Sequence, residues 1–234
     1  MSQLRVLITG GSRGIGRAIA LRFAKEGAYV IVNSRSSDQL DAVVSEIEAA
    51  GGKGTASQVN VADWGSVEGA VFRNTQSTGG AIDVLVNCAG NFDIKPFDKM
   101  DIQTWDNAIS VNLTGAFQMT LECLEGLEES DNAHIFMINS TAGREGFPGN
   151  TAYCASKYGL KGFTDALRID LAEKNIRVSS VYPGQTDTGI WDKIDGDWDR
   201  SKMNQPEDVA EVVWQAYNAP AGEPVDDLEV PPRG

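Results

Sequence analysis

The chain alternates between short apolar runs and helical patterns along its whole length. The apolar runs predict seven strands, at 4–8, 28–33, 55–61, 82–87, 134–139, 176–183 and 226–230. Helical patterns fill the intervals, at 14–27, 38–50, 64–78, 101–128, 151–174 and 206–218. Near-continuous apolar strands that alternate with helices are typical of a parallel sheet covered on both faces. The sequence therefore predicts the α/β fold class with a doubly wound sheet.

Length and composition favour a single domain. The chain has 234 residues, of which 41% are hydrophobic, and this is enough for one large core but short for two. We therefore expect one domain over 1–234. The net charge is −13 and the sequence shows no cluster of Lys and Arg, which argues against a nucleic-acid partner.

The cysteines and the amino terminus indicate a cytoplasmic protein. Cys88, Cys123 and Cys154 are odd in number and form no C-x-x-C pair, which is typical of a reduced, intracellular chain. The first apolar run is too short for a signal peptide or a membrane span. We expect a soluble cytoplasmic protein without a membrane partner.

A glycine-rich turn, TGGSRGIG at 9–16, joins the first predicted strand to the first predicted helix. Gly10, Gly14 and Gly16 allow a tight turn and a close approach of the backbone to a ligand. The amino end of the following helix offers free N–H groups and the positive end of its dipole to a phosphate. A glycine turn in this position predicts a dinucleotide site.

The same turn also matches G-x-S-x-G over 10–14, the nucleophile elbow of hydrolases. That alternative needs a histidine base placed after an acid partner, and the sequence has one histidine, His134, at the head of a predicted strand. An ordinary strand-edge role explains His134 better, so the hydrolase hypothesis is disfavoured. One histidine and scattered cysteines also lead us to expect no metal site.

The end of the second predicted strand, VNSRSS at 32–37, selects the cofactor. An acidic residue there would bind the ribose 2′-hydroxyl of NAD, but none stands before Asp38. Arg35 can grip a 2′-phosphate with its planar guanidinium, and Arg13 in the glycine turn can approach the same phosphate. Each arginine alone is more often a solvated surface charge, but the two at these places predict NADP(H).

A tyrosine and a lysine four residues apart predict acid–base chemistry. Tyr153 and Lys157 share one face of a helical segment, TAYCASKYGL at 151–160. A phenol with a pKa of about 10 is a poor base at neutral pH, but a neighbouring ammonium stabilises its phenolate and lowers the pKa. Ser140 can hold a substrate oxygen, and Asn112 can anchor a water chain to Lys157. Each residue alone also has an ordinary structural explanation, and together they favour catalysis.

Six motifs, in order and spacing, resemble those of the classical short-chain dehydrogenases/reductases. They are TGGSRGIG at 9–16, NCAG at 87–90, SVNLTG at 110–115, INSTAG at 138–143, YCASK at 153–157 and YPGQTDT at 182–188. The resemblance runs from residue 4 to about 218. It implies a single-domain Rossmann fold with a seven-stranded parallel sheet. It also implies a homodimer or homotetramer whose interface is built by the helices at 101–128 and 151–174.

The resemblance further implies roles for individual residues. The catalytic tetrad would be Asn112, Ser140, Tyr153 and Lys157. Tyr153 and Lys157 would also bind the cofactor, with Lys157 at the nicotinamide ribose. The other implied cofactor-binding residues fall into groups along the cofactor. The pyrophosphate would be bound by Gly10, Gly14, Ile15 and Gly16, and the adenosine ribose phosphate by Ser12, Arg13 and Arg35 with Ser34 beside them. Adenine would be contacted by Asn60 and Val61, the adenosine-side ribose by Asn87, Ala89 and Gly90, and the nicotinamide and its phosphate by Pro183, Gly184, Thr186 and Thr188.

Two features depart from the family pattern. Cys88 stands where the family usually has a second asparagine, and we expect its backbone to serve instead. The segment 185–204, the expected substrate lid, is short for the family. Trp191 and Trp198 within it either form an aromatic wall of the substrate site or pack the lid onto the body, and the sequence favours neither.

The sequence thus predicts an NADP(H)-dependent oxidoreductase that interconverts a ketone or aldehyde with an alcohol, with Tyr153 as general acid and base. One alternative is a 3-oxoacyl thioester reductase, although a chain of charge −13 without a basic patch would be a poor partner for an acidic acyl carrier protein. Another is a non-catalytic module that senses NADP(H), which would not need Tyr153 and Lys157 together. Substrate determinants are expected in 91–99, 141–150 and 185–204, including Phe92, Arg144, Phe147 and Trp191.

Overall fold

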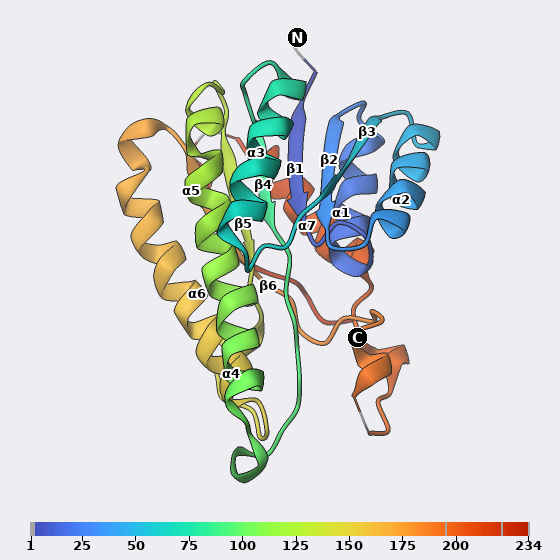
Figure 1. Cartoon of the computed structure of the whole chain (residues 1–234), viewed down its shortest axis with the longest axis vertical. Helices are drawn as coiled ribbons and strands as arrows, with labels where there is room; N and C mark the ends of the chain where they lie inside the picture. Colours follow the sequence, from blue (N-terminus) through green and yellow to red (C-terminus); the bar gives the residue numbers. More distant parts are fainter. Residues whose placement is uncertain (1–2, 195, 221, 234) are drawn as a thin grey trace.

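A single parallel sheet organises the computed structural model, which describes residues 3–194, 196–220 and 222–233 (Figure 1). The strands lie in the order β3-β2-β1-β4-β5-β6-β7, and every neighbouring pair is parallel. The predicted fold class is confirmed. The strands are β1 (Arg5–Thr9), β2 (Tyr29–Ser34), β3 (Lys53–Gln58), β4 (Val84–Asn87), β5 (His134–Ile138), β6 (Arg177–Tyr182) and β7 (Asp227–Glu229).

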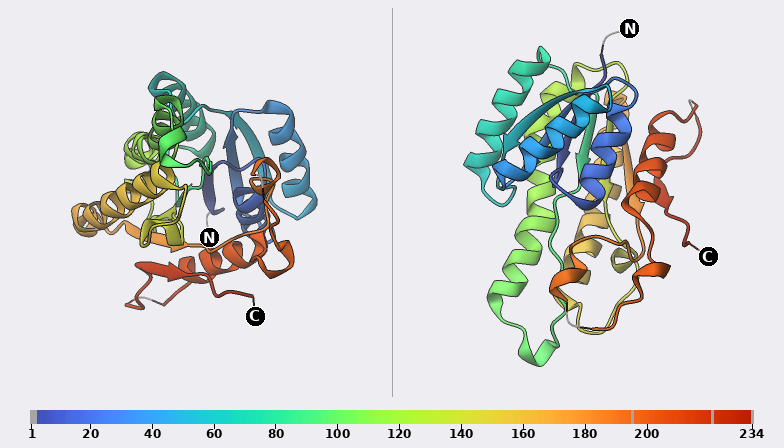
Figure 2. Two further views of the ribbon diagram at one scale, coloured as in Figure 1. Left: turned by 90° about the horizontal axis from the view of Figure 1, so that it is seen from below. Right: turned by 90° about the vertical axis from the view of Figure 1, so that its right-hand side faces the viewer.

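Helices cover both faces of the sheet, as Figure 2 shows from two further sides. The helices are α1 (Gly14–Ala24), α2 (Ser37–Ala49), α3 (Trp64–Thr78), α4 (Ile102–Ile109), α5 (Gly115–Glu128), α6 (Thr151–Asp170) and α7 (Pro206–Tyr217). Side chains that alternate along each strand enter two separate cores. Val6 and Ile8 of β1 pack toward α1, α2 and α7, whereas Leu7 packs toward α3, α5 and α6.

The side of the sheet on which successive strands are added reverses beside β1. From β1 the chain runs outward through β2 to β3, and it then returns to place β4 on the other side of β1. In open α/β sheets, a ligand cleft forms at such a reversal, outside the carboxyl ends of the strands. In Figure 1 the carboxyl ends of the strands lie at the lower edge of the sheet, where α4 and the orange segment before α7 extend below it on opposite sides.

The predicted helix at 101–128 differs from the observed one in an informative way. α4 and α5 are joined without a break by a π-helical turn, Ser110–Thr114. Such turns are rare and occur frequently at functional sites. Asn112, a predicted catalytic residue, lies within this turn and is 1% exposed. The other predicted long helix, at 151–174, ends at Asp170 and continues as a 3-10 turn, Ala172–Lys174.

Candidate active site

A cavity of about 660 Å³ lies at the carboxyl edge of the sheet. It begins at the glycine turn after β1, passes the end of β2 and reaches α6. Of the predicted site residues, the following line it: Gly10, Ser12, Arg13, Gly14, Ile15, Gly16, Ser34, Arg35, Asn60, Val61, Ala89, Gly90, Tyr153, Lys157 and Thr188. Segments that are far apart in the sequence therefore meet around one cavity.

The glycine turn packs so closely that side chains are excluded from parts of it. Gly10 and Gly14 have φ angles of 67° and 54°, in the left-handed region that favours glycine. A Cβ atom on Gly16 would collide with the carbonyl oxygen of Gly10, and one on Gly10 would lie 2.9 Å from the Cα of Ala89. This close packing leaves the amino end of α1 facing the cavity, where its N–H groups can bind phosphate.

Thr9 connects the turn after β1 to the loop after β4. Its hydroxyl accepts hydrogen bonds from the backbone N–H groups of Cys88 and Ala89, both at 2.9 Å. These bonds involve only the backbone of Cys88, so the thiol in place of the usual asparagine leaves this junction intact. Burial raises the pKa of the Cys88 thiol to about 12, so the thiol is neutral at physiological pH.

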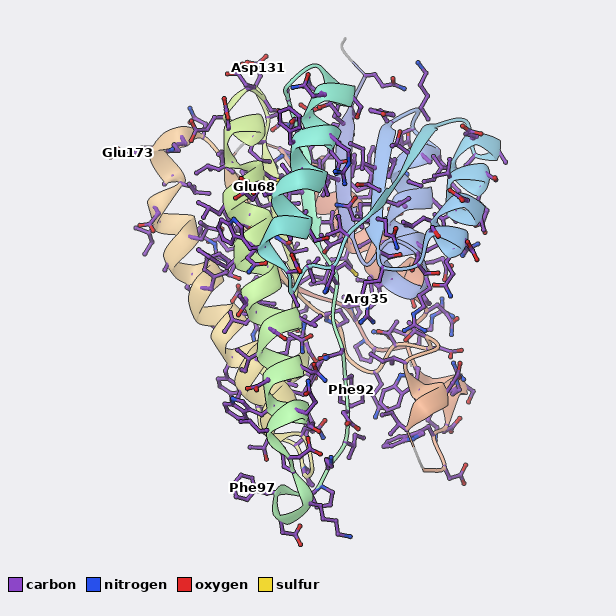
Figure 3. The ribbon with its side chains drawn as sticks, viewed as in Figure 1. Arg35, Glu68, Phe92, Phe97, Asp131 and Glu173 are labelled. Carbon is purple, nitrogen blue, oxygen red and sulfur yellow. The ribbon has the colours of Figure 1, made fainter. Side chains whose placement is uncertain are left out.

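Arg13 and Arg35 both line the cavity and are exposed. Figure 3 shows Arg35 below the strands, on the side of the molecule where β2 and α2 lie. Neither arginine is in an ion pair within the described residues, whereas Arg17 on α1 pairs with Glu46. Two unpaired guanidinium groups at one end of the cavity fit the 2′-phosphate of NADP(H).

Four predicted cofactor contacts lie outside this cavity lining. The side chain of Asn87 turns into the body and donates a hydrogen bond to the hydroxyl of Thr120 at 3.0 Å. Thr186 donates to the carbonyl oxygen of Gly184 at 3.1 Å. Pro183 and Gly184 precede the lining segment that begins at Thr188.

Lys157 is held in a buried position beside Tyr153. Its Nζ donates a hydrogen bond to the carbonyl oxygen of Ile138 at 2.8 Å and lies 5.7 Å from the centroid of the Tyr153 ring. Burial lowers the pKa of Lys157 to about 8. Burial also raises the pKa of Tyr153 to about 12, although a hydrogen bond from Ser140 opposes this increase. The predicted lowering of the Tyr153 pKa is therefore wrong for the chain by itself, because burial dominates and raises it.

Asn112 connects the loop after β4 to α6. Its Oδ1 accepts a hydrogen bond from the N–H of Asn91 at 2.8 Å, and its Nδ2 donates to the Asn91 carbonyl and the Ser156 hydroxyl, both at 3.0 Å. Ser156 in turn donates to the carbonyl oxygen of Tyr153 at 2.7 Å. The buried amide is thus satisfied by the protein, and its contacts fix the helix turn that carries Tyr153.

Ser140 follows β5 and begins a 3-10 turn, Thr141–Gly143. Its Oγ accepts a hydrogen bond from the N–H of Ala142 at 3.1 Å, and its side chain makes the hydrogen bond to Tyr153 described above. The end of β5 and the first turn of α6 therefore bring Ser140 and Tyr153 together, although they are thirteen residues apart.

A second cavity, of about 430 Å³, meets the first at Tyr153. Asn91, Asn107 and Tyr153 line both cavities. The remaining lining residues of the second cavity are Phe92, Asp93, Asp101, Gln103, Thr104, Ala108, Ala152 and Ile194. Asn91 falls in the segment 91–99, where substrate determinants were expected, whereas Asn107 was absent from the predicted site. Only the folded arrangement of α4 brings Asn107 to the same place.

Trp191 of the lid packs between Trp198 and Phe92, and Phe92 itself packs against Tyr153. The ring centroids are 4.8 Å apart for Phe92 and Tyr153, 5.5 Å for Phe92 and Trp191, and 4.7 Å for Trp191 and Trp198. The Nε1 of Trp191 donates a hydrogen bond to the carbonyl oxygen of Thr186 at 2.9 Å. Trp191 therefore packs the lid onto the body and at the same time supports the aromatic wall that Phe92 presents.

Arg144 was predicted as a substrate determinant, and that prediction is wrong. Its guanidinium lies 3.5 Å from the centroid of the Tyr182 ring and forms ion pairs with Asp227 and Glu229 of β7. Phe147 is 41% exposed and lines neither cavity. The carboxylates of β7 hold Arg144 away from the site. Because these partners come from the distant last strand, the sequence near residue 144 does not reveal the ion pairs.

His134 takes no part in the candidate site. It begins β5, at the edge of the sheet opposite the cavities, and its Nε2 lies 2.7 Å from the hydroxyl of Ser179. Burial, and to a lesser degree Arg177, lowers the pKa of His134 well below its usual range. The hydrolase alternative fails because this base is at the wrong end of the sheet. In the described part of the chain, no group of three or more His, Cys, Asp or Glu is placed to hold a metal ion.

The fold and the site together define a class of protein. A glycine turn that faces a cavity at the reversal of a doubly wound sheet, with a buried lysine beside a tyrosine, is typical of nucleotide-dependent oxidoreductases. The family model described as short chain dehydrogenase matches residues 5–198. The chain belongs to this family, and the predicted membership is confirmed.

Known proteins of this family resemble the chain over most of its length. The chain is 37% identical to the 3-oxoacyl-[acyl-carrier-protein] reductase FabG of Thermotoga maritima, over 88% of this chain and 87% of that protein. It is 31% identical to the glycine betaine reductase ATRR of Emericella nidulans over 97% of this chain, but it spans only 18% of that protein's length. The solved structure of a metagenomic short-chain oxidoreductase in complex with NADP is 29% identical, with a TM-score of 0.85 over 98% of this chain and 97% of that one.

Proposed function

We propose that this chain interconverts a carbonyl compound and an alcohol with NADP(H), and that Tyr153 transfers the proton. The observation that carries the proposal is the place of Tyr153, which lines both cavities and has the buried Lys157 one helical turn behind it. The first cavity is then the cofactor site and the second cavity the substrate site, and the reacting atoms of cofactor and substrate meet beside Tyr153.

The residues of the first cavity fit NADP(H). The glycine turn leaves a cradle that a Cβ on Gly16 would fill, and Arg13 and Arg35 supply charge for the 2′-phosphate. The NADP complex of a 29% identical oxidoreductase supports the same choice. When bound, the nicotinamide supplies or accepts the hydride.

The protein's own residues handle the substrate oxygen. The Tyr153 hydroxyl donates its proton to that oxygen in the reducing direction and removes it in the oxidising direction. Ser140 holds the same oxygen by a hydrogen bond, and the ammonium of Lys157 stabilises the phenolate that Tyr153 becomes. Asn112 keeps Tyr153 in place through Ser156 and Asn91.

The proposal is tested by cofactor oxidation with purified protein. We expect NADPH to be oxidised in the presence of at least one member of a panel of ketones, aldehydes, quinones and 3-oxoacyl esters, and NADH to react much more slowly. Tight NADPH binding without reaction on any member would instead favour a non-catalytic sensing module. The buried Lys157 beside Tyr153 argues against such a module, because cofactor binding without catalysis would not need the two residues together.

A 3-oxoacyl thioester reductase is the second candidate, and the observation in its favour is the 37% identity to a 3-oxoacyl-[acyl-carrier-protein] reductase. Thioesters of this kind reach the enzyme on anionic carriers. The second cavity presents Asp93 and Asp101 to such a carrier, which disfavours it. The cofactor assay above separates the two candidates by the best member of its panel.

Replacing Arg35 by alanine is expected to raise the KM for NADPH by about tenfold to a hundredfold, because a hydrogen-bonded pair of charges contributes about 1.5–3 kcal/mol. The KM for NADH should change by less than about twofold, since NADH has no 2′-phosphate. Arg73→Ala is the matched control, because it removes the same charge from the exposed face of α3. Equal effects of Arg35→Ala on both cofactors would contradict the assignment.

Replacing Lys157 by methionine is expected to stabilise the cofactor-free protein at pH 7 by about 1–3 kcal/mol while activity is lost. With a folded pKa of about 8 against an ordinary 10.5, folded Lys157 binds fewer protons than the unfolded chain between these values. Stability of the parent protein therefore rises with pH across this window, and the penalty is complete below pH 8. The advantage of the variant should accordingly shrink toward pH 10.5.

Urea denaturation at pH 7 and pH 10 measures this difference. Lys161→Met on the same helix is the control, because Lys161 is partly exposed and pairs with Asp165 at 2.6 Å. Its effect should stay below about 1 kcal/mol at both pH values. A Lys157→Met variant that is no more stable than the parent, or whose advantage is independent of pH, would refute the burial penalty.

We also propose that the chain forms a homodimer or homotetramer through α4, α5 and α6. These helices expose large apolar side chains, which mark interaction surfaces in soluble proteins. The exposed members are Ile102, Trp105, Phe117, Leu121, Tyr158 and Ile169. Leu121→Glu is expected to reduce the mass measured by light scattering to that of a monomer, whereas Phe72→Glu on α3 should leave it unchanged. A monomeric parent protein would contradict the proposal.

The free cysteines support a cytoplasmic location for the enzyme. Cys88, Cys123 and Cys154 are all unpaired, as expected in a reducing compartment. None of the helices formed by the described residues is sufficiently long and apolar to cross a membrane.

We propose that the whole chain acts as one catalytic domain, with 185–204 as its substrate lid.

A further inference from the structure

The second cavity has an acidic lining. Asp93 and Asp101 contribute carboxylates to it, and no Lys or Arg is among its lining residues in the described part of the chain. Lys95 pairs with Asp101 at 2.5 Å and so neutralises one of the two. No ion pair involves Asp93 within the same described residues. One uncompensated negative charge therefore faces the space beside Tyr153.

An aromatic ring stands next to this charge. Phe92, the chain neighbour of Asp93, lines the cavity, and its ring is held between Tyr153 and Trp191 by edge-to-face contacts with interplanar angles of 69° and 66°. Figure 3 shows Phe92 on the strand-like loop between α4 and the lid. Because contacts on two sides already fix the ring, ligand binding loses no further conformational entropy in ordering it.

We propose that the substrate is an aldehyde or ketone that carries a positively charged ammonium group a short distance from its carbonyl, bound by Phe92 and Asp93. This inference rests on the proposed function, with Tyr153 at the carbonyl oxygen. The Phe92 and Tyr153 ring centroids are 4.8 Å apart, so the aromatic ring lies beside the residue that meets the carbonyl oxygen, and an ammonium group close to the carbonyl fits this arrangement.

The chemistry of the cavity selects this class over its alternatives. Aromatic faces attract cations, and quaternary ammonium groups are commonly recognised by aromatic rings. A nearby carboxylate adds attraction, whereas an anionic substrate would have to approach Asp93 in a chain of charge −13. The remaining polar lining, including Gln103 and Thr104, offers further polar side chains around a charged group.

The decisive experiment compares two aldehydes of nearly equal shape. (Trimethylammonio)acetaldehyde and 3,3-dimethylbutanal differ mainly in the replacement of a charged nitrogen by carbon. With NADPH, we expect kcat/KM for the cationic aldehyde to exceed that for the neutral one by about tenfold or more, because only the charged nitrogen gains a cation–π contact and the attraction of the carboxylate. Equal values, or a preference for acetoacetyl-CoA, would overturn the inference and leave the proposed function standing.

Two substitutions locate the effect. Phe92→Leu and Asp93→Asn should each reduce the ratio of cationic to neutral kcat/KM at least threefold. The matched controls are Phe97→Leu, at the exposed tip below α4, and Asp131→Asn, at the opposite end of the molecule in Figure 3. These controls should leave the ratio unchanged. If all four variants keep the parental ratio of cationic to neutral kcat/KM, the selectivity does not depend on Phe92 and Asp93, and their assignment as the cation site is refuted.

A binding measurement separates this inference from the proposed function. Calorimetry of the protein with NADP⁺ is carried out with choline and with its neutral isostere, 3,3-dimethylbutan-1-ol. Tighter binding of choline, lost in Asp93→Asn, supports the cation site even if no aldehyde is reduced, in which case the proposed catalysis alone fails. Equal or weaker binding of choline refutes the cation site whatever the catalytic result.

Discussion

Tyr153→Phe is expected to lower kcat on the order of a thousandfold or more, since general acid–base catalysis contributes about 10²–10⁴-fold. The variant keeps the ring that packs against Phe92 at 4.8 Å and the helix that carries it. It removes only the hydroxyl, which lies at the junction of the two cavities. The dissociation constant for NADPH should therefore change less than about threefold.

Single-turnover kinetics with saturating NADPH, together with a fluorescence titration of the cofactor, measures both quantities. Tyr158→Phe is the matched control, because Tyr158 lies on the same helix and is 47% exposed. Its kcat should equal that of the parent protein. Substantial turnover by Tyr153→Phe would exclude Tyr153 as the proton donor, and a large loss of NADPH affinity would indicate that the tyrosine acts mainly through the cofactor.

Gly16→Ala is expected to weaken NADPH binding by about tenfold to a hundredfold, because overpacking at a close contact costs about 1–3 kcal/mol. The new methyl group would collide with the carbonyl oxygen of Gly10 and would meet the Cα of Gly11 at 3.1 Å. Relief requires the turn to move away from α1, and this movement distorts the surface that binds phosphate.

Gly162→Ala provides the control for this substitution. Gly162 lies within α6, and nothing lies within 4 Å of the position of its added Cβ. Alanine there should stabilise the protein by up to about 1 kcal/mol through helix propensity alone and leave NADPH affinity unchanged. Gly16→Ala with parental NADPH affinity would show that the turn adapts without cost and that its glycine is not required by the phosphate site.

The fold was predictable from sequence because its strongest signals are local. A buried parallel strand such as β4 or β5 is a nearly continuous apolar run, and its limits in the structure lie within two residues of the predicted ones. The exception is β3, an edge strand with the sequence KGTASQ, which begins two residues before its predicted start and ends three before its predicted end. An edge strand needs few apolar residues, so periodicity locates it less accurately.

The candidate site was predictable only in part, because some of its features are properties of the fold. The glycine turn and the Tyr153–Lys157 pair are short sequence patterns, and the structure brings them to one cavity. The pKa of Tyr153 depends on burial by distant segments, so the spacing to Lys157 could not supply it. The contact of Asn112 with Asn91 likewise joins residues 21 positions apart.

The ion pairs between Arg144 and β7 have a consequence for how this enzyme can be altered. Arg144 follows the Ser140 turn by one residue, and it anchors that turn to Asp227 and Glu229 near the end of the chain while stacking on Tyr182. The last strand therefore supports the position of Ser140, the proposed partner of the substrate oxygen. We expect substitutions of Asp227 or Glu229 to lower activity although neither residue lines a cavity, so a change at 144, 227 or 229 has to be matched at the other two positions.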